Sequence, residues 1–340
     1  MAILVTGTAG FIGYHVARRL LTAGKSVIGI DEINAYYDPQ LKRDRLAALR
    51  ELGGDFTFHQ LDFANEEALE TALAGADIDR IVHLGAQAGV RYSIDNPRAY
   101  VRANLAGHLN ILELARARKV AHLVYASSSS VYGARAKQPS SLSDRVDHPI
   151  SLYAATKKAD ELMSETYAHL YRIPQTGLRF FTVYGPWGRP DMALFKFTKG
   201  ILEGIPIPVY NRGEMIRDFT YIDDIVEAVI RVIDKPPESL LSDSEGAEES
   251  TGTATPYRIY NIGNNKAVPL MDYIQALEKA LGCKAHLDLL PMQPGDVAAT
   301  EADVSRLAAD FDYRPQVQVR EGISKFVEWY REYYGVPVNC

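Results

Sequence analysis

Short apolar runs alternate with amphipathic segments through the first half of the chain. The apolar runs predict strands, and the segments with apolar positions three and four residues apart predict helices. Because several strands are apolar throughout, we expect helices on both faces of one parallel, doubly wound sheet. The predicted strands are 2–6, 26–31, 56–62, 80–84, 122–127 and 175–180, and the predicted helices are 11–23, 41–52, 66–74, 97–118 and 151–171.

After about residue 180 the pattern changes, and glycine and proline become frequent, as in 185–190 and 204–208. Helices are predicted at 223–235 and 321–334. We therefore expect an α/β fold in which a Rossmann domain of residues 1–180 plus about 218–262 carries a smaller, discontinuous α/β substrate domain of about 181–217 plus 263–340. Residues 236–256 are rich in Ser, Glu, Gly and Thr, which predicts a flexible insertion.

A glycine loop joins the first predicted strand to the first predicted helix. Gly7, Gly10 and Gly13 follow the spacing G-x-x-G-x-x-G and enclose Phe11 and Ile12. In such a loop backbone amides approach a pyrophosphate, whose charge lies at the helix N-terminus. Many dehydrogenases use G-x-G-x-x-G instead, and glycines also serve tight turns. The position at a strand–helix junction is what favours a dinucleotide cofactor.

Acidic residues end the second and third predicted strands. A carboxylate at Asp31 can accept both adenosine-ribose hydroxyls and repels a 2′-phosphate; no Arg follows closely, so NAD is favoured over NADP. Asp62, next to Phe63, can reach the adenine amine, and an N-cap of the following helix is an equal alternative. The segment after the fourth strand should border the middle of the cofactor through Leu84, Ala86 and Gln87.

Four serines, 127–130, end the fifth predicted strand, and Tyr153 and Lys157 follow on a predicted helix. Residues four apart share one helix face, so a phenol, an ammonium and the Ser128 hydroxyl can converge on one alcohol. The chain has 20 tyrosines, so a Tyr-x-x-x-Lys match alone is weak, and a surface Tyr–Lys pair is the simpler alternative. The glycine loop upstream favours an alcohol-oxidation site.

Composition excludes several classes of protein. The net charge of −6 and the pI of about 5.8 offer no general attraction to nucleic acid. No apolar stretch approaches transmembrane length, so we expect no membrane partner. Cys283 and Cys340 show no metal-ligand spacing, and we expect no metal. The N-terminus has no basic segment followed by an apolar one, so we expect a cytoplasmic protein.

The chain resembles the extended short-chain dehydrogenase/reductase family, within it the nucleotide-sugar 4-epimerases, and most closely the UDP-glucuronate 4-epimerases. The resemblance covers nearly the whole chain apart from 236–256. It rests on five segments that occur together and in order, 31–42 (DEINAYYDPQLK), 87–93 (QAGVRYS), 185–192 (GPWGRPDM), 217–224 (RDFTYIDD) and 292–296 (MQPGD).

This resemblance implies a role for each matching residue. Tyr153 would be the catalytic base and acid, and Ser128 would hydrogen-bond the sugar hydroxyl. Lys157 would bind the nicotinamide ribose, and its positive charge would favour the phenolate. Arg217 would pair with the diphosphate and Asp296 with the uridine ribose, although surface ion pairs are the simpler alternative. The remaining residues expected near the nucleotide are Phe195, Lys196, Val209 and Tyr210.

The implied reaction is NAD-dependent 4-epimerisation of UDP-glucuronate to UDP-galacturonate through a transient 4-keto sugar, by an isomerase that keeps its NAD bound. Glucose/galactose epimerases usually have Asn where this chain has Thr182. We expect Thr182, Ser129, Ser130 and Arg189 to hold the C6 carboxylate, with Arg91 as a second candidate for the one cation of this site. Local capping by Ser129 and Ser130 is the alternative.

Two other enzymes and a non-catalytic protein stay open as alternatives. A UDP-glucuronate decarboxylase follows if the 4-keto sugar loses its carboxylate, and a UDP-glucose/UDP-galactose 4-epimerase follows if the sugar is neutral. A dinucleotide-sensing protein without catalysis would not need the serine, tyrosine and lysine set. The helices predicted at 97–118 and 151–171 are rich in Ala and Leu, and we expect them to pair with their copies as a four-helix bundle in a homodimer.

Overall fold

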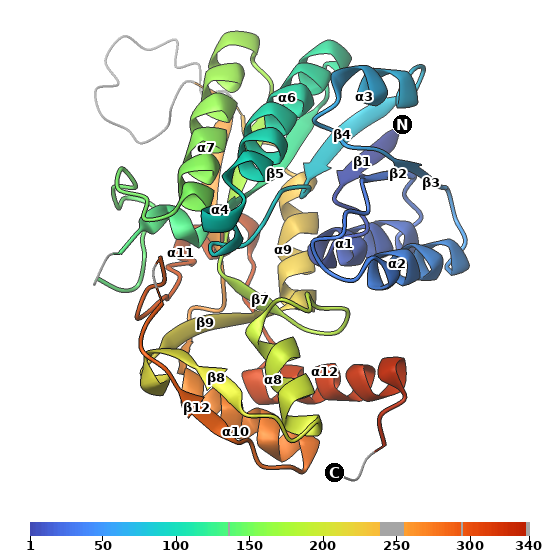
Figure 1. The fold of residues 1–340 in the computed structure, drawn as a ribbon. Helices are drawn as coiled ribbons and strands as arrows, with labels where there is room; N and C mark the ends of the chain where they lie inside the picture. Colours follow the sequence, from blue (N-terminus) through green and yellow to red (C-terminus); the bar gives the residue numbers. More distant parts are fainter. Residues whose placement is uncertain (135–136, 239–254, 294, 338–340) are drawn as a thin grey trace.

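The computed structural model describes residues 1–134, 137–238, 255–293 and 295–337 (Figure 1). The predicted flexible insertion at 236–256 lies outside the described residues over 239–254.

The main sheet has seven parallel strands in the order β10-β6-β5-β4-β1-β2-β3. All six strands predicted for the first 180 residues are present, with ends shifted by up to two residues. The last strand, β10, comes from beyond residue 255 and pairs with β6. The bounds are β1 Ala2–Thr6, β2 Val27–Asp31, β3 Phe56–Gln60, β4 Ile78–His83, β5 His122–Ser128, β6 Gln175–Phe180 and β10 Tyr257–Ile262.

Helices cover both faces of this sheet, as the apolar strands predicted. Alternate residues of β1 enter different cores: Ile3 and Val5 pack with α1 and α9, whereas Leu4 packs with α3 and α6, because successive strand residues point to opposite faces. The bounds are α1 Phe11–Thr22, α2 Pro39–Glu51, α3 Glu66–Ala72, α6 Gly107–Arg118, α7 Leu152–Tyr171 and α9 Ile222–Ile233.

The predicted helix over 97–118 is wrong in detail, since it is three segments: α5 (Pro97–Tyr100), a π-helical stretch η1 (Val101–Ala106) and α6. A short helix, α4 (Tyr92–Asp95), precedes them. The irregular stretch contains Asn104, whose side chain bonds the backbone of Gln87 and the hydroxyl of Thr156. Such π-bulges are frequent at functional sites.

The smaller part of the molecule lies below the main sheet in Figure 1. It contains a three-stranded sheet, β11-β9-β7, and a two-stranded sheet, β12-β8. Its bounds are β7 Thr182–Tyr184, α8 Ala193–Leu202, β8 Ile207–Val209, β9 Ile216–Tyr221, β11 Ala267–Pro269, α10 Leu270–Leu281, β12 Leu287–Leu289 and α12 Val319–Tyr334, with the 3₁₀ helix η3 Tyr210–Gly213. Two short elements lie beside the main sheet instead: the 3₁₀ helix η2 Ser129–Tyr132, which follows β5, and α11 Ser305–Phe311, which packs on β10 and α9.

Buried side chains of α1 and α2 attach the loop after β7 to the main sheet. Arg45, which is fully buried, donates to the carbonyls of Ala9, Trp187 and Gly188 at 2.6–3.0 Å. His15 pairs with the Pro186 carbonyl at 2.9 Å, and burial lowers its pKa to about 3. One cation therefore joins the glycine loop to the smaller part of the molecule.

Candidate active site

The glycine loop is closely packed against the end of β4. Gly7 has φ +70°, and a Cβ there would lie 2.8 Å from the Gly85 nitrogen; a Cβ on Gly13 would lie 2.0 Å from the Gly7 carbonyl oxygen. Only glycine fits these two positions. Gly10 caps α1 without a side-chain hydrogen bond, so the first amides of α1 remain open to an anion.

Asp31 at the end of β2 organises the backbone around this loop. Its carboxylate accepts hydrogen bonds from the Ala9 amide at 3.2 Å and the Ile33 amide at 2.8 Å. Each carboxylate oxygen can accept a second bond, so the ribose hydroxyls expected here need not displace the backbone. The glycine cradle and this carboxylate fit an adenosine diphosphate.

Asp62 does not cap α3, because Asn65 does so through the Ala68 amide. Its carboxylate accepts from the Ala64 amide and pairs with Arg102, whose Nη2 is 2.6 Å away. The N-cap alternative is therefore wrong. The neighbouring Phe63 is buried, and its ring packs against Gly85 and Gly107. A Cβ added at either glycine would collide with this ring.

Asn104 is a residue that the sequence reasoning missed. Its amide accepts from the Gln87 amide at 2.8 Å, donates to the Gln87 carbonyl at 3.2 Å and donates to Thr156 at 3.0 Å. It thereby fixes the segment after β4 to α7. Leu84 and Ala86, in the same segment, are half-buried. An asparagine inside an apolar helix pattern was the available signal.

The predicted catalytic residues lie on β5 and α7, which pack together. Ser151 caps α7 through the Ala154 amide, and Tyr153 lies in the first turn, half-buried. Lys157 is 3% exposed and donates to the Ala126 carbonyl at 2.9 Å, two residues before Ser128. A lysine has three donors. The structure therefore brings the Lys157 ammonium to the end of the strand that carries Ser128.

The four serines differ in their contacts. Ser128 accepts from the Ser130 amide at 3.1 Å and caps η2, so the local capping that was the alternative role of Ser129 and Ser130 belongs to Ser128. Ser127 donates to Glu161 at 2.7 Å. Ser129 and Ser130 are half-buried, and among the described residues their hydroxyls have no hydrogen bond to another side chain or to the backbone.

A buried ion pair lies directly behind the serines. Glu161 is 1% exposed and pairs through both oxygens with Arg179, at 2.7 and 2.9 Å. Arg179 also donates to Tyr132 at 3.0 Å. Burial raises the pKa of Glu161, but the bonds from Arg179, its charge and the bond from Ser127 outweigh this and lower the pKa. The pair links α7, β5, β6 and η2.

Three residues expected to bind the nucleotide, Tyr210, Arg217 and Asp296, come together with Arg91, which was expected at the C6 carboxylate. We call these four residues, which lie between the two parts of the molecule, the arginine cluster. Asp296 lies 2.9 Å from Arg217 and 3.5 Å from Arg91. The Arg91 guanidinium covers the Tyr210 ring at 4.7 Å. Arg217 also donates to the carbonyls of residues 216, 297 and 298, so a diphosphate would replace some of these bonds.

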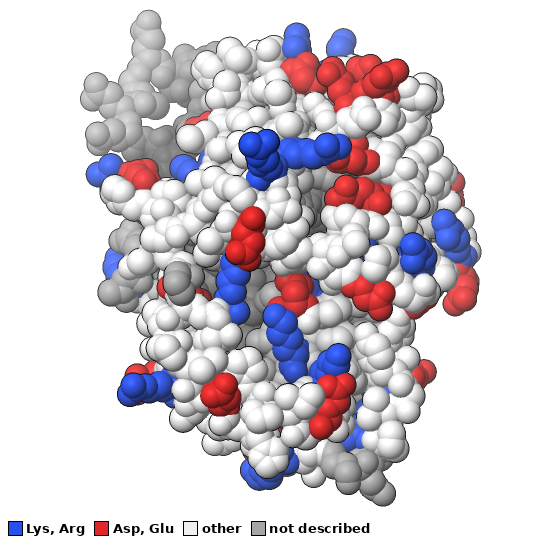
Figure 2. Space-filling model, viewed as in Figure 1, with Lys and Arg blue, Asp and Glu red and all other residues white. Residues whose placement is uncertain are grey.

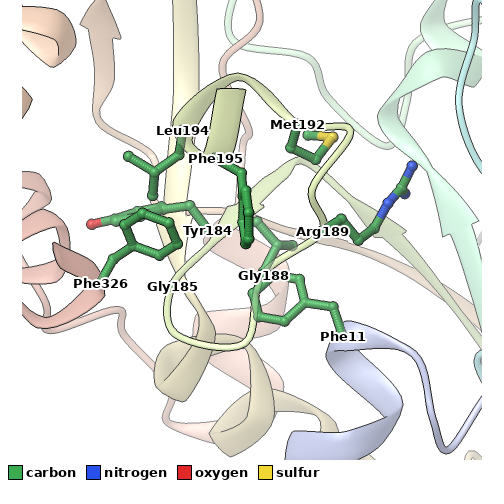
Figure 3. A pocket seen from close by; sticks show the side chains of 10 residues that line it. Phe11, Tyr184, Gly185, Gly188, Arg189, Met192, Leu194, Phe195 and Phe326 are labelled. Carbon is green, nitrogen blue, oxygen red and sulfur yellow. The ribbon is translucent and has the colours of Figure 1, made fainter. Parts of the chain in front are cut away.

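Arg189 is held by its own carboxylate partner. Its guanidinium binds both oxygens of Asp191, at 3.0 and 2.5 Å, and Tyr36 donates to the same carboxylate at 3.0 Å. In Figure 3 the Arg189 side chain points away from Phe195 and Phe326. The cavity beside it measures only about 20 Å³. The positive charge of Arg189 is therefore already compensated by Asp191. Thr182, which was expected at the same carboxylate, lies half-buried at the start of β7.

Two residues expected at the nucleotide are core residues. Phe195 is 6% exposed and packs its ring against Phe326, Trp329 and Tyr330. Val209 is fully buried in β8. The Phe195 ring lines the small cavity beside Arg189, and the Val209 side chain is enclosed by the core. Lys196 is exposed on α8.

One face of the molecule is drawn in Figure 2, and on it basic and acidic side chains are intermingled over both parts of the molecule. This face offers no continuous basic groove for a nucleic acid backbone. In the described part of the chain, no helix has the length and apolar character needed to cross a membrane.

Comparisons with known proteins agree on one family. A model described as "NAD dependent epimerase/dehydratase family" matches residues 3–263. A probable UDP-glucuronate 4-epimerase of Rhizobium meliloti is 50% identical over 98% of each chain, and UDP-glucuronate 4-epimerase 1 of Arabidopsis thaliana is 46% identical over 98% of this chain and 78% of its own. A Bacillus cereus UDP-glucuronic acid 4-epimerase structure with UDP-glucuronic acid and NAD is 33% identical, with a TM-score of 0.86 over 98% of this chain and 100% of its own.

Proposed function

We propose, because this chain belongs to the NAD dependent epimerase/dehydratase family, that it is an isomerase that interconverts UDP-glucuronate and UDP-galacturonate by 4-epimerisation. The observation that carries the proposal is the contact of Lys157 with the end of the strand that bears Ser128, one helical turn from Tyr153. The relatives named for this reaction cover nearly the whole chain.

The glycine loop and Asp31 would hold NAD. The amides at the start of α1 would bind the diphosphate, and Asp31 would accept the ribose hydroxyls. The remaining cofactor contacts would come from Phe11, Ile12, Asp62, Phe63, Leu84, Ala86 and Gln87. Bound NAD would supply reversible oxidation at C4 of the sugar.

Tyr153 would take the proton of the C4 hydroxyl and return it. Ser128 would orient that hydroxyl, and a donor of Lys157 not used by Ala126 would reach the nicotinamide ribose. The 4-keto sugar would rotate within the site, so that C4 regains its hydrogen on the opposite face. Cofactor and protein would then end in their starting states.

The C6 carboxylate of a 4-keto uronate is β to the ketone and can leave as CO₂. Holding it with hydrogen bonds keeps it charged and out of line with the carbonyl. We propose that Ser129, Ser130 and Thr182 donate these bonds, because Arg189 is already paired with Asp191. Neutral donors around one anion satisfy it without a second buried charge.

The arginine cluster would bind the UDP moiety. Arg217 would bind the diphosphate and Asp296 the uridine ribose. Arg91 and Tyr210, which contact each other, would form the adjoining side of the nucleotide site. Lys196 would lie nearby. The NAD site would then lie in the Rossmann domain, residues 1–180 plus about 218–262. Most of the UDP-sugar site would lie in the substrate domain, about 181–217 plus 263–340.

We further propose a homodimer in the cytoplasm, formed through a four-helix bundle. Leu109 on α6 and Leu162 and Leu170 on α7 are exposed, and a second copy would cover them. A monomer in light scattering at working concentration would contradict this bundle.

The test is incubation of the purified protein with UDP-glucuronate, followed by proton NMR and mass spectrometry. We expect UDP-galacturonate of unchanged mass. A pentose product with CO₂ would instead identify a decarboxylase, and preferred turnover of UDP-glucose would identify a glucose/galactose 4-epimerase. Tyr153→Phe is the matched control and should give no product.

A further inference from the structure

Asp160 lies three residues after Lys157 on α7 and contacts the same ammonium. Lys157 donates to its Oδ2 at 3.1 Å. The Asp160 and Lys157 side chains are 1% and 3% exposed, so neither charge is screened by solvent. Lys157 therefore sits between the Ala126 carbonyl and a buried carboxylate, with its remaining donor directed elsewhere.

The carboxylate of Asp160 is under-satisfied. Its Oδ1 is buried and has no hydrogen-bond partner among the described residues. Burial raises the pKa of Asp160 to about 6; the Lys157 charge and hydrogen bond oppose this rise, and the neighbouring Glu161 adds to it.

Among the described residues, Lys157 is the cation that acts on Asp160, and three titratable groups on neighbouring elements lie close to the pair. His108 on α6 and His83 on β4 are buried, and burial lowers the pKa of His108 to about 3 and that of His83 well below its usual value. Tyr125 on β5 is buried, and burial raises its pKa well above the usual value. All three are neutral at working pH, so Lys157 alone compensates Asp160.

An apolar residue at this position of α7 would cost less folding free energy than Asp160, because a buried carboxylate needs hydrogen-bond partners for both oxygens. Resting on the NAD site proposed above, we propose that Asp160 is a positioning residue that acts through Lys157: it holds the ammonium against Ala126, and its ionisation sets the net positive charge that the pair presents to the bound cofactor.

The consequence is a switch in local charge. With Asp160 ionised, the Asp160–Lys157 pair is neutral and tolerates the cationic nicotinamide ring of NAD⁺. With Asp160 protonated, the pair carries one positive charge, which disfavours NAD⁺ relative to the uncharged ring of NADH. One unit charge at about 10 Å in a medium of effective dielectric about 20 changes that preference roughly tenfold.

The test uses the holoprotein. Wild type, Asp160→Asn and the control Glu165→Gln, which removes an exposed acid from the same helix, are equilibrated with an excess of equal NAD⁺ and NADH at pH 5 and pH 8. After desalting, the bound nucleotides are quantified by chromatography. We expect wild type and Glu165→Gln to favour NAD⁺ roughly tenfold more at pH 8 than at pH 5, and Asp160→Asn to show the pH 5 preference at both.

Equal ratios in wild type and Asp160→Asn at both pH values would overturn the proposal, as would a wild-type ratio independent of pH. A purely structural Asp160 would change the melting temperature and leave the ratio unmoved. The ratio of bound NAD⁺ to NADH is measured without a sugar, so this test is independent of the epimerase proposal. If wild type did not turn over UDP-glucuronate, the proposed function would be wrong, but the ratio could still be measured.

Discussion

The β5–α7 region and the arginine cluster are built differently. Ser128 and Lys157 are buried on regular elements that pack along their lengths. Arg91 and Asp296 are partly exposed, and Asp296 comes from a loop. The first region holds reacting groups rigidly, as proton transfer requires. The second joins two parts of the molecule, as recognition of a long nucleotide sugar requires.

The largest effect should come from removing the phenol of Tyr153. Tyr153→Phe should lower kcat by about 100- to 10,000-fold, the range for loss of a general acid–base. Melting temperature and bound NAD should stay near wild type, because the ring is retained. Steady-state kinetics and cofactor analysis check this, and turnover within a few-fold of wild type would remove Tyr153 from the chemistry.

The next effect should come from the ion pair behind the serines. Glu161→Gln leaves the buried Arg179 charge uncompensated and should lower the free energy of unfolding by about 3–5 kcal/mol. Chemical denaturation measures this loss.

The matched control for Glu161→Gln is Glu321→Gln, which breaks an exposed pair with Lys325 and should cost about 0.5 kcal/mol or less. Because the pKa of Glu161 is lowered in the folded protein, its stabilisation is present above its usual pKa and is lost as pH falls through the folded value. Equal losses of stability in the two variants would contradict the larger contribution assigned to the buried Glu161–Arg179 pair.

Within the arginine cluster, Arg217 should matter most. Arg217→Ala removes charge-assisted bonds worth about 1.5–3 kcal/mol, so KM for UDP-glucuronate should rise about 10- to 100-fold with little change in kcat. Arg320→Ala, exposed on α12, is the control. A loss confined to kcat would move Arg217 from binding to chemistry.

Arg91 should have the smallest effect. Its side chain is half exposed, and its pair with Asp296 is long at 3.5 Å. Exposed ion pairs contribute about 0.2–1 kcal/mol, so Arg91→Ala should weaken UDP binding at most about fivefold in titration calorimetry. A larger loss than that of Arg217→Ala would reverse the ranking of the two arginines.

Much of the fold could be predicted because strand and helix periods are local properties. The strands at 2–6 and 175–180 match the structure to the residue. The helix at 97–118 was wrong in detail because Asn104 turns inward to bond Gln87 and Thr156, and its partners lie 17 and 52 residues away along the chain. Tertiary hydrogen bonds here override the local preference.

The candidate site divides in the same way. Gly7 and Asp31 could be identified from their position at strand ends, and the structure places them together through Ala9. The pairing of Arg189 with Asp191 was not anticipated, although the two are only two residues apart in the motif, since the sequence does not say whether a cation faces a ligand or a nearby carboxylate of its own chain. Likewise, an apolar or aromatic residue in a family motif, such as Phe195, can belong to the core.

The sequence by itself determined the doubly wound sheet, the glycine loop and the Ser128, Tyr153 and Lys157 set, because these depend on short-range periodicity and on motifs within one strand–helix unit. Only the tertiary structure decided which charges are already compensated. Glu161 with Arg179, Arg189 with Asp191, and Lys157 with Asp160 are settled by packing, because burial and the distance between two charged atoms control their energy.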